Sequence, residues 1–538
     1  MSLVPVSIEP KREPVLQGTR DGIPVLLWLI LAAGALLRLY ALAAESFYFD
    51  EAYSVWAAGH SAGWLIKVST ERIFPPLYYL LLHFWLPLGK SEFAVRLLSV
   101  VFGLVSILGI YAVAKQLFDT RVGLLSALLL AISPLHLWYS QEARMYMVLL
   151  TLGLCSVTFL LLSLREGRRW HWLAYVLSTA LAMNTHYFTL FLAVFENVYA
   201  LYLFLRQPEG RSIWKQWLLS QVAIALLSVI GLAGIFSGES GYWWGVLDTW
   251  HGAPTWRDLI SLMLKFSLGS LISGRLAYMV TLAVFGSCAA WSLIRFRGAR
   301  PGQVSSSPGE TKPHPSPRAE TLATRLQAMD EGLVFALMYL VIPVGAIFLV
   351  SQFRSFWVLR YLFAFLPPYC ILVGRGIARM PGRVLPALLT TVIVLVSLWP
   401  ISDMYRFRQK EDWRGAVQYI ASQERPGDVL FMVDEDLWLP FEHYYQGAMN
   451  HAGISRSITD RDFLAARVGL AASSYKRIWL VLSHTDNALL KDYLLTSGDT
   501  DLVAEKHLVD VEVYLFTVNP PPASKGGTPA TAGIAGGS

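Results

Sequence analysis

The sequence has 538 residues, of which 55% are hydrophobic and only 15% carry a charge. Soluble domains usually carry about 25% charged residues, so this composition excludes an ordinary soluble globular protein. The net charge of +6 lies in short basic clusters between apolar runs, which argues against nucleic acid as a partner and for a lipid bilayer.

The first predicted elements are a polar segment and a long series of membrane spans. Residues 1–23 are polar, and the apolar run that follows is long enough to cross a bilayer, so we expect a retained first helix and not a cleaved signal peptide. The lengths of the apolar runs predict about eleven spans, at 24–43, 95–115, 121–139, 145–163, 171–188, 189–206, 217–236, 275–295, 331–350, 359–377 and 384–402.

The charges of the loops predict the topology. With the basic N-terminal segment in the cytoplasm, every second loop between the predicted spans is basic. Counting the apolar segment 75–88 as a span would invert this pattern. The segment is short and proline-rich, so we predict a helix along the outer membrane surface. Two long outer loops are then expected, at 44–94 and 237–274.

The composition changes again in the second half of the chain. The module at 24–297 is followed by a Pro-, Ser- and Gly-rich segment at 298–328, which is typical of a flexible linker and is expected in the cytoplasm. The last spans lie in 329–402. Alternating strand-like and helix-like runs in 403–519 predict a small extracytoplasmic α/β domain. The composition of residues 520–538 predicts a disordered tail. The strands are expected at 428–433, 477–483 and 511–518.

Two adjacent carboxylates form the first candidate site. Asp50 and Glu51 follow the first predicted span, with Phe49 before them and Tyr53 after them. A solvated helix end would explain the pair, but partly desolvated acids beside a membrane are often functional as a base or a ligand.

The second candidate is the segment 138–146, at the outer end of the third predicted span. Glu142 and Arg144 can face a common cavity there. The planar fork of arginine suits a phosphate, although an internal ion pair that closes the loop is the alternative.

Two further segments on the same side carry candidate residues. His186 could bind a metal, hold a phosphate or transfer a proton, although a lone histidine at an interface is usually structural. Arg354 and Arg360 depart from the positive-inside pattern, so we expect an anionic partner such as a lipid phosphate, with snorkelling to headgroups as the alternative.

All four candidates fall on one side of the membrane under a topology derived from loop charge alone. A transporter or lipid flippase is less favoured, because transporters place polar groups near the bilayer midplane. A noncatalytic assembly protein, whose α/β domain binds a partner, is the other alternative.

In their order along the chain, these motifs resemble the GT-C fold membrane glycosyltransferases of the dolichyl-phosphate-mannose protein mannosyltransferase-like superfamily. The similarity runs over about residues 24–205, and the plan also resembles lipid A aminoarabinose transferases. It rests on Asp50-Glu51-Ala52-Tyr53-Ser54, Pro75-Pro76-Leu77-Tyr78-Tyr79, Ser91-Glu92-Phe93-Ala94-Val95-Arg96-Leu97, Ser140 to Tyr146, Thr185-His186-Tyr187 and Arg360-Tyr361.

This resemblance implies an inverting transferase that moves a sugar from a polyprenyl-phosphate-linked donor to a hydroxyl of a glycan, lipid or protein. It would act on the extracytoplasmic face of a bacterial inner (plasma) membrane. Asp50 would be the general base, with Glu51 beside it in the catalytic pair. The residues expected to bind the donor phosphate are Arg144, Arg360 and Arg354, and those expected to line the cavity are Glu142, His186, Tyr53, Tyr146, Tyr187 and Tyr361.

No cofactor follows with certainty from the resemblance. A divalent cation held by Glu51, Glu142 or His186 stays open.

Overall fold

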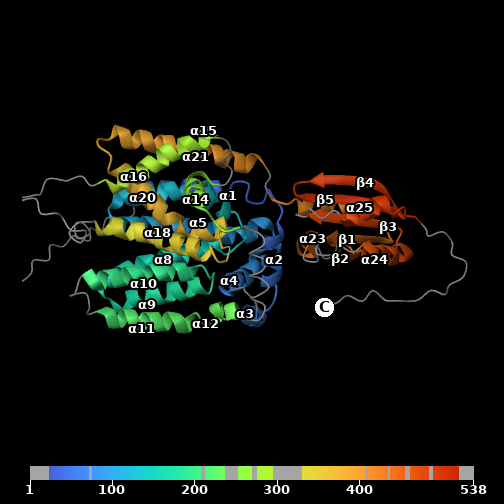
Figure 1. Cartoon of the computed structure of the whole chain (residues 1–538), viewed down its shortest axis with the longest axis horizontal. Coiled ribbons are helices and arrows are strands. Elements are labelled where there is room, and N and C mark those ends of the chain that lie inside the picture. Colours follow the sequence, from blue (N-terminus) through green and yellow to red (C-terminus); the bar gives the residue numbers. More distant parts are fainter. Residues whose placement is uncertain are drawn as a thin grey trace, which may run out of the picture.

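The computed structural model is a helical bundle with a small sheet domain at one end (Figure 1). The expected polytopic α-helical membrane fold with a C-terminal α/β domain is confirmed. The structure describes residues 24–71, 75–206, 213–236, 252–269, 275–294, 330–354, 356–407, 410–433, 437–454, 461–483 and 489–519. The predicted N-terminal segment 1–23, the linker 298–328, the tail 520–538 and much of the loop 237–274 lie outside these residues.

Within the described residues, six helical segments are long and apolar enough to cross a membrane. They are α5 (Glu92–Leu117), α8 (Tyr146–Glu166), α10 (Thr189–Arg206), α18 (Glu331–Val350), the segment Leu359–Ala378 that contains α19 (Leu359–Leu362) and α20 (Leu366–Ala378), and α21 (Val384–Arg406).

Two bent pairs would raise this number to eight if each were one span. In the first, α6 (Thr120–Ala131) and α7 (Pro134–Ser140) meet at 62°. Pro134 explains the break, because its ring cannot continue the preceding helix, and Ser133 caps the new one. In the second, α11 (Trp214–Leu227) meets the segment Val229–Phe236, which contains α12 (Val229–Ala233), at 61°.

The expected number of about eleven spans is therefore too high. The predicted spans 24–43 and 171–188 form α1 (Val25–Leu39) and α9 (Arg169–Met183), which have 15 residues each. Such a helix is roughly 22 Å long, less than the hydrocarbon core of a bilayer. The predicted span 275–295 forms α15 (Arg275–Thr281), a π-helical turn and α16 (Ser287–Leu293) in one helix, whose apolar part, Tyr278–Leu293, is also shorter than a span. The lengths of the apolar runs alone overestimate the number of spans, because polar ends and turns take up part of each run.

Short helices cover the end of the bundle that faces the sheet domain (Figure 1). They are α2 (Phe49–Ala58), α3 (Ala62–Glu71) and α4 (Leu77–Trp85). The proline-rich segment 75–88 thus forms α4 and a 3-10 turn at Leu86–Leu88, too short to span a bilayer. Its position on the outer membrane surface stays a prediction. The remaining described helix of the bundle is α14 (Trp256–Leu268).

The sheet domain has five strands in the order β2-β1-β3-β5-β4. The strands are β1 (Asp428–Val433), β2 (Asn450–Ile454), β3 (Arg477–Ser483), β4 (Thr500–Leu508) and β5 (Val511–Val518). The pairs β2-β1 and β1-β3 are parallel, whereas β3-β5 and β5-β4 are antiparallel. Helices α22 (Trp413–Gln423) and α23 (Trp438–Tyr444) cover one face, and α24 (Arg461–Ser474) and α25 (Leu489–Thr496) cover the other. Strands β1 and β3 are buried throughout, as expected for strands covered on both faces.

The sheet domain meets the bundle through α23, which packs on α2. The rings of Trp56 and Trp438 lie 6.1 Å apart at right angles, and those of Phe47 and His443 lie 4.9 Å apart. The sheet domain therefore contacts the α2 end of the bundle, which carries the first candidate residues.

Candidate active site

Helix α2 begins at Phe49, which places Asp50 and Glu51 in its first turn. Free backbone N–H groups at a helix N-terminus favour carboxylates there. Consecutive helical residues point about 100° apart, and the two acids diverge accordingly. Glu51 enters the bundle and is fully buried, whereas the Asp50 side chain keeps 25% exposure.

Glu51 is held by Arg96, which lies in the first turns of α5. The guanidinium donates from Nε to Oε1 at 2.8 Å and from Nη2 to Oε2 at 2.6 Å, and the Ala143 amide donates to Oε1 at 2.8 Å. Burial alone would raise the pKa of Glu51, but Arg96 and Lys410 outweigh it and hold this pKa below its ordinary value. Both oxygens of Glu51 are thus occupied, and the carboxylate is ionised.

Arg96 also fixes the chain that leads into α2. It donates from Nη1 to the carbonyls of Leu42 and Glu45, and from Nη2 to that of Ser46, each at 2.9 Å. The Glu51–Arg96 pair therefore anchors α2 and its approach to the bundle.

Asp50 faces the opposite way and meets Arg360, which lies in α19, 310 residues further along the chain. Arg360 donates from Nη1 to Asp50 Oδ2 at 3.2 Å. Both side chains remain partly exposed. This contact joins two candidate residues that the sequence predicted on the same side of the membrane.

Arg144 joins the same group from the turn between α7 and α8. Its Nη1 donates to the Asp50 carbonyl at 3.1 Å and to Ser54 Oγ at 3.2 Å, and the residue is only 7% exposed. Its Nε is buried without a hydrogen-bond partner among the described residues, and so is the Nε of Arg360. Two buried guanidinium donors close to Asp50 thus lack an acceptor, which an anion would supply.

Glu142 lies beside Arg144 in this turn. Its Oε1 accepts a hydrogen bond from the Tyr48 hydroxyl, and its main-chain carbonyl accepts one from Ser99 Oγ at 2.7 Å. Its Oε2 is buried and has no partner within the described part of the chain. Burial raises the pKa of Glu142, although Lys410, Arg144 and Arg360 oppose this. The predicted internal ion pair with Arg144 is not formed, because Arg144 is directed to Asp50 and Ser54 instead.

His186 lies in the turn after α9. Its Nδ1 accepts from the Phe188 amide at 3.2 Å, which leaves the ring proton on Nε2, and its ring centroid is 5.1 Å from that of Tyr361. Burial, with Arg144 and Arg360 nearby, lowers the pKa of His186 to about 3. The imidazole is therefore neutral.

Of the four candidate tyrosines, Tyr361 and Tyr146 lie beside Arg360. The Tyr361 ring lies 5.4 Å from the Arg360 guanidinium, and Tyr146 is buried with its ring 5.0 Å from that of Tyr139. Tyr53 packs between Trp56 and Tyr79, at 5.6 and 6.2 Å. The Tyr187 hydroxyl is buried and lacks a partner among the described residues.

The last candidate, Arg354, is exposed in the bend after α18.

Two of the three residues expected to hold a divalent cation, Glu51 and His186, are engaged by other groups. The oxygens of Glu51 are occupied by Arg96 and Ala143, and the Nδ1 of His186 is an acceptor for a backbone amide. Throughout the described ranges, no group of three or more His, Cys, Asp or Glu side chains is arranged to hold a metal ion.

The sequence reasoning missed Lys410, whose Nζ lies 3.3 Å from Glu51 Oε2. It also gave no role to Arg96, although a charge at the start of an apolar run was a usable signal. Lys410 lies in a polar segment where nothing in the sequence distinguishes it from a solvated lysine.

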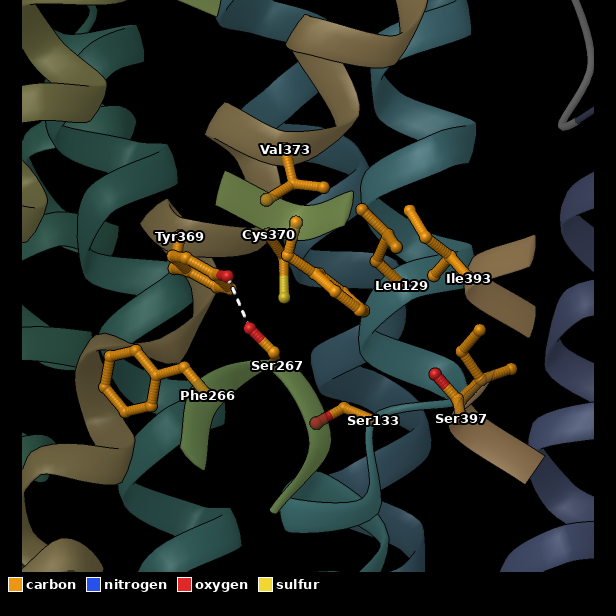
Figure 2. A pocket seen from close by; sticks show the side chains of 11 residues that line it. Leu129, Ser133, Phe266, Ser267, Tyr369, Cys370, Val373, Ile393 and Ser397 are labelled. Carbon is orange, nitrogen blue, oxygen red and sulfur yellow. Dashed lines mark hydrogen bonds between the residues drawn. The ribbon is translucent and has the colours of Figure 1, made fainter. Parts of the chain in front are cut away.

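A separate pocket lies between the break of α6 and α7, α14, α20 and α21 (Figure 2). Its lining is mostly apolar, and the Ser267 and Tyr369 hydroxyls form a 2.6 Å hydrogen bond across it. None of the candidate site residues lines this pocket, and no charged side chain does. The charged groups therefore meet at the α2 end of the bundle and not in this pocket.

Comparisons with known proteins show which proteins this chain is similar to. Residues 74–233 match the family described as dolichyl-phosphate-mannose-protein mannosyltransferase. A comparison with curated protein sequences gives no match. The crystal structure of apo ArnT from Cupriavidus metallidurans is 14% identical over 91% of this chain and 97% of that chain, with a TM-score of 0.54.

Two further solved structures are similar. ArnT from the same organism bound to undecaprenyl phosphate is 14% identical over 92% of this chain and 98% of that chain, again with a TM-score of 0.54. The Archaeoglobus fulgidus oligosaccharyltransferase in complex with Zn and sulfate is 10% identical over 85% of this chain and 67% of that chain, with a TM-score of 0.52. This chain is thus a multi-pass membrane protein of the GT-C fold, mannosyltransferase-like in its residues 74–233.

Proposed function

We propose that this protein is an inverting glycosyltransferase that moves a sugar from a polyprenyl-phosphate-linked donor to a hydroxyl acceptor. The single observation that carries the proposal is the meeting of Asp50, Arg144 and Arg360 at one end of the bundle. A carboxylate that can take a proton lies there beside two guanidinium groups with unused buried donors.

The charges of the site fit a phosphate diester. The Nε atoms of Arg144 and Arg360 are buried and lack an acceptor among the described residues, which the oxygens of a singly charged phosphodiester would supply. The basic residues around the site are Arg96, Arg144, Arg360 and Lys410, and the carboxylates near them are Glu45, Asp50, Glu51 and Glu142.

In the reaction, Asp50 takes the proton of the acceptor hydroxyl as the hydroxyl oxygen attacks the anomeric carbon. The bond between that carbon and the phosphate oxygen breaks, and polyprenyl phosphate leaves with the electron pair. Because one displacement occurs, the anomeric centre is inverted. Arg360 moves from Asp50 to the phosphate on donor binding, which frees Asp50 to act as base. Arg144 keeps its contacts to α2 and turns its unused Nε to the phosphate.

Glu51 acts as a positioning residue in this mechanism. Its two oxygens are occupied and its pKa is low, so it holds α2 against Arg96 and takes no proton. His186 is neutral, and its Nε2–H is available to the sugar or the phosphate. No step requires a divalent cation.

The alternation of basic loops supports a cytoplasmic N-terminus. An outer site and sheet domain then require an odd number of membrane crossings, so the proposal needs a further crossing, such as the short helix α1, beyond the six or eight found among the described residues. The name of the matching family and the undecaprenyl phosphate bound to ArnT support a polyprenyl-phosphate donor. The acceptor is a glycan, a lipid or a protein, and the transfer assay below distinguishes these.

The test is a transfer assay in liposomes with a panel of polyprenyl-phosphate sugars and cell-extract acceptors. The wild type is compared with Asp50→Asn, Arg360→Ala and Arg354→Ala. We expect release of polyprenyl phosphate by the wild type, loss of roughly 100-fold or more in Asp50→Asn, and weaker donor binding in Arg360→Ala. Because Arg354 is exposed, Arg354→Ala is the matched control for the loss of an outer arginine.

Equal release by Asp50→Asn and the wild type would keep the enzyme class and remove Asp50 as the base. Absence of release with every donor and acceptor, combined with movement of the labelled lipid across the bilayer, would favour a transporter or flippase. Absence of both would favour a noncatalytic assembly protein.

A further inference from the structure

Lys410 lies in the short connection between α21, which ends at Arg406, and α22, which begins at Trp413. A lysine in such a connection is ordinarily solvated, yet Lys410 is only 8% exposed. Its ammonium group lies 3.3 Å from Glu51 Oε2 and donates to the carbonyl of Gln141 at 3.2 Å. One side chain from the base of the sheet domain thus contacts both segments that carry the candidate chemistry.

The first of these segments is α2, where Glu51 is adjacent to Asp50. The second is the turn at 141–145, which carries Glu142 and Arg144. The turn is also joined to α2 by the hydrogen bond from the Ala143 amide to Glu51 and by those from Arg144 to the Asp50 carbonyl and Ser54 Oγ. Lys410 adds a further link, which ties the buried Glu51 carboxylate to the carbonyl of Gln141.

Lys410 also acts on Glu142 through an aromatic ring. Its ammonium group is 5.3 Å from the centroid of the Tyr48 ring and 5.9 Å from that of Trp138. Tyr48 in turn donates its hydroxyl to Glu142. A cation over a phenol ring stabilises the ring in place, so Lys410 also holds the donor to Glu142.

Docking of the sheet domain does not depend on Lys410 alone. Arg414 pairs with Glu92 at 2.5 Å, and the Tyr444 hydroxyl donates to the same Glu92 oxygen at 2.8 Å. The Ser46 hydroxyl donates to the carbonyl of Glu411 at 2.6 Å. These contacts lie around the site and fix the domain, so the burial of a further cation against Glu51 is not explained by docking.

We propose that Lys410 is a positioning residue that holds α2 and the turn at 141–145 in register, so that Asp50 and Arg144 face the same donor phosphate. The proposal rests on the function proposed above. Lys410 acts through Glu51 and Gln141 and does not touch the substrate.

The fold should tolerate the loss of this lysine. In Lys410→Met, Glu51 keeps both hydrogen bonds from Arg96 and the one from Ala143, so no buried carboxylate is left unpaired. The turn loses one of its links to α2. A displacement of about 1 Å in a reacting group can cost roughly 100-fold in rate, so the effect falls on the rate of transfer more than on stability.

The first measurement is the kcat and donor KM of Lys410→Met, Glu51→Gln, the double variant and Arg414→Met. We expect Lys410→Met to lower kcat by roughly 10- to 100-fold with donor KM within about threefold of wild type. The double variant should be no slower than Glu51→Gln, because the lysine acts through that carboxylate. Arg414→Met is the matched control, since it removes a docking cation from the same interface and leaves Lys410 in place.

The second measurement is hydrogen exchange of the backbone amides in 48–54 and 138–146. We expect faster exchange there in Lys410→Met and unchanged exchange in Arg414→Met. An unchanged kcat together with unchanged exchange in Lys410→Met would overturn the proposal, and so would equal losses in Arg414→Met. If the wild type transfers no sugar, the proposed function fails, and the exchange rates alone decide whether Lys410 positions the two segments.

Discussion

Replacing Arg96 by methionine tests the internal anchor of the site. The variant removes two hydrogen bonds to Glu51 and three to the carbonyls of Leu42, Glu45 and Ser46. Removing one partner of a buried ion pair costs about 3–5 kcal/mol, because the other charge stays buried. Lys410 remains near Glu51 and compensates in part, so we expect a loss near 3 kcal/mol.

Reversible unfolding of the purified protein in mixed micelles, followed by tryptophan fluorescence, measures this loss. The matched control is Arg168→Met, whose pair with Glu166 is largely exposed, with 64% of the arginine side chain accessible. An exposed pair contributes only about 0–1 kcal/mol. Equal stability of Arg96→Met and Arg168→Met would refute the view that Glu51 and Arg96 anchor α2. An additional Glu51→Met change should recover part of the loss, since the buried charge is then gone.

Three further predictions concern pH and the sheet domain. Because the pKa of His186 is about 3, His186→Gln should leave the pH dependence of transfer between pH 5 and 8 unchanged; a shifted acid limb would contradict this. In the folded protein the pKa of Glu51 lies below its ordinary 4.5. The wild type should therefore have its full advantage in unfolding free energy over Glu51→Gln above pH 4.5, and this advantage should shrink as the pH falls through the lowered pKa. Chemical unfolding at several pH values checks the sign. In the sheet domain, Asp428→Asn weakens the 2.6 Å and 2.8 Å contacts from Arg477, so limited proteolysis should cleave this domain faster while the bundle remains intact.

The sequence predicted the central strands of the sheet domain but not its edges. The runs at 428–433, 477–483 and 511–518 coincide with β1, β3 and β5, which are rich in apolar residues. Strands β2 and β4 were missed because each has a partner on one side only. In β4 most side chains are exposed, so its sequence has no apolar run.

The sequence predicted a common side of the membrane for the candidate residues, which stays a prediction, but it could not predict their contacts. Asp50 and Glu51 were treated as a pair, although successive helical positions point in different directions. Which of them enters the bundle depends on Arg96, in another helix. The contact of Asp50 with Arg360 joins residues far apart in the chain, and no local pattern encodes such a distance. The overcounted spans have a simpler cause, since apolar length was taken for helix length.

The order in which the ribosome makes the site follows from where its parts lie in the sequence. Asp50, Glu51 and Arg96 emerge early, so the carboxylate anchor can form as soon as α5 is in the membrane. Arg360 and Lys410 emerge much later. Domains generally fold as their chain is synthesised, so an unfinished chain would hold α2 in place without the cations that complete the site. Under the proposed function, a nascent chain would be inert towards the donor until the last membrane helix and the start of the sheet domain have been made.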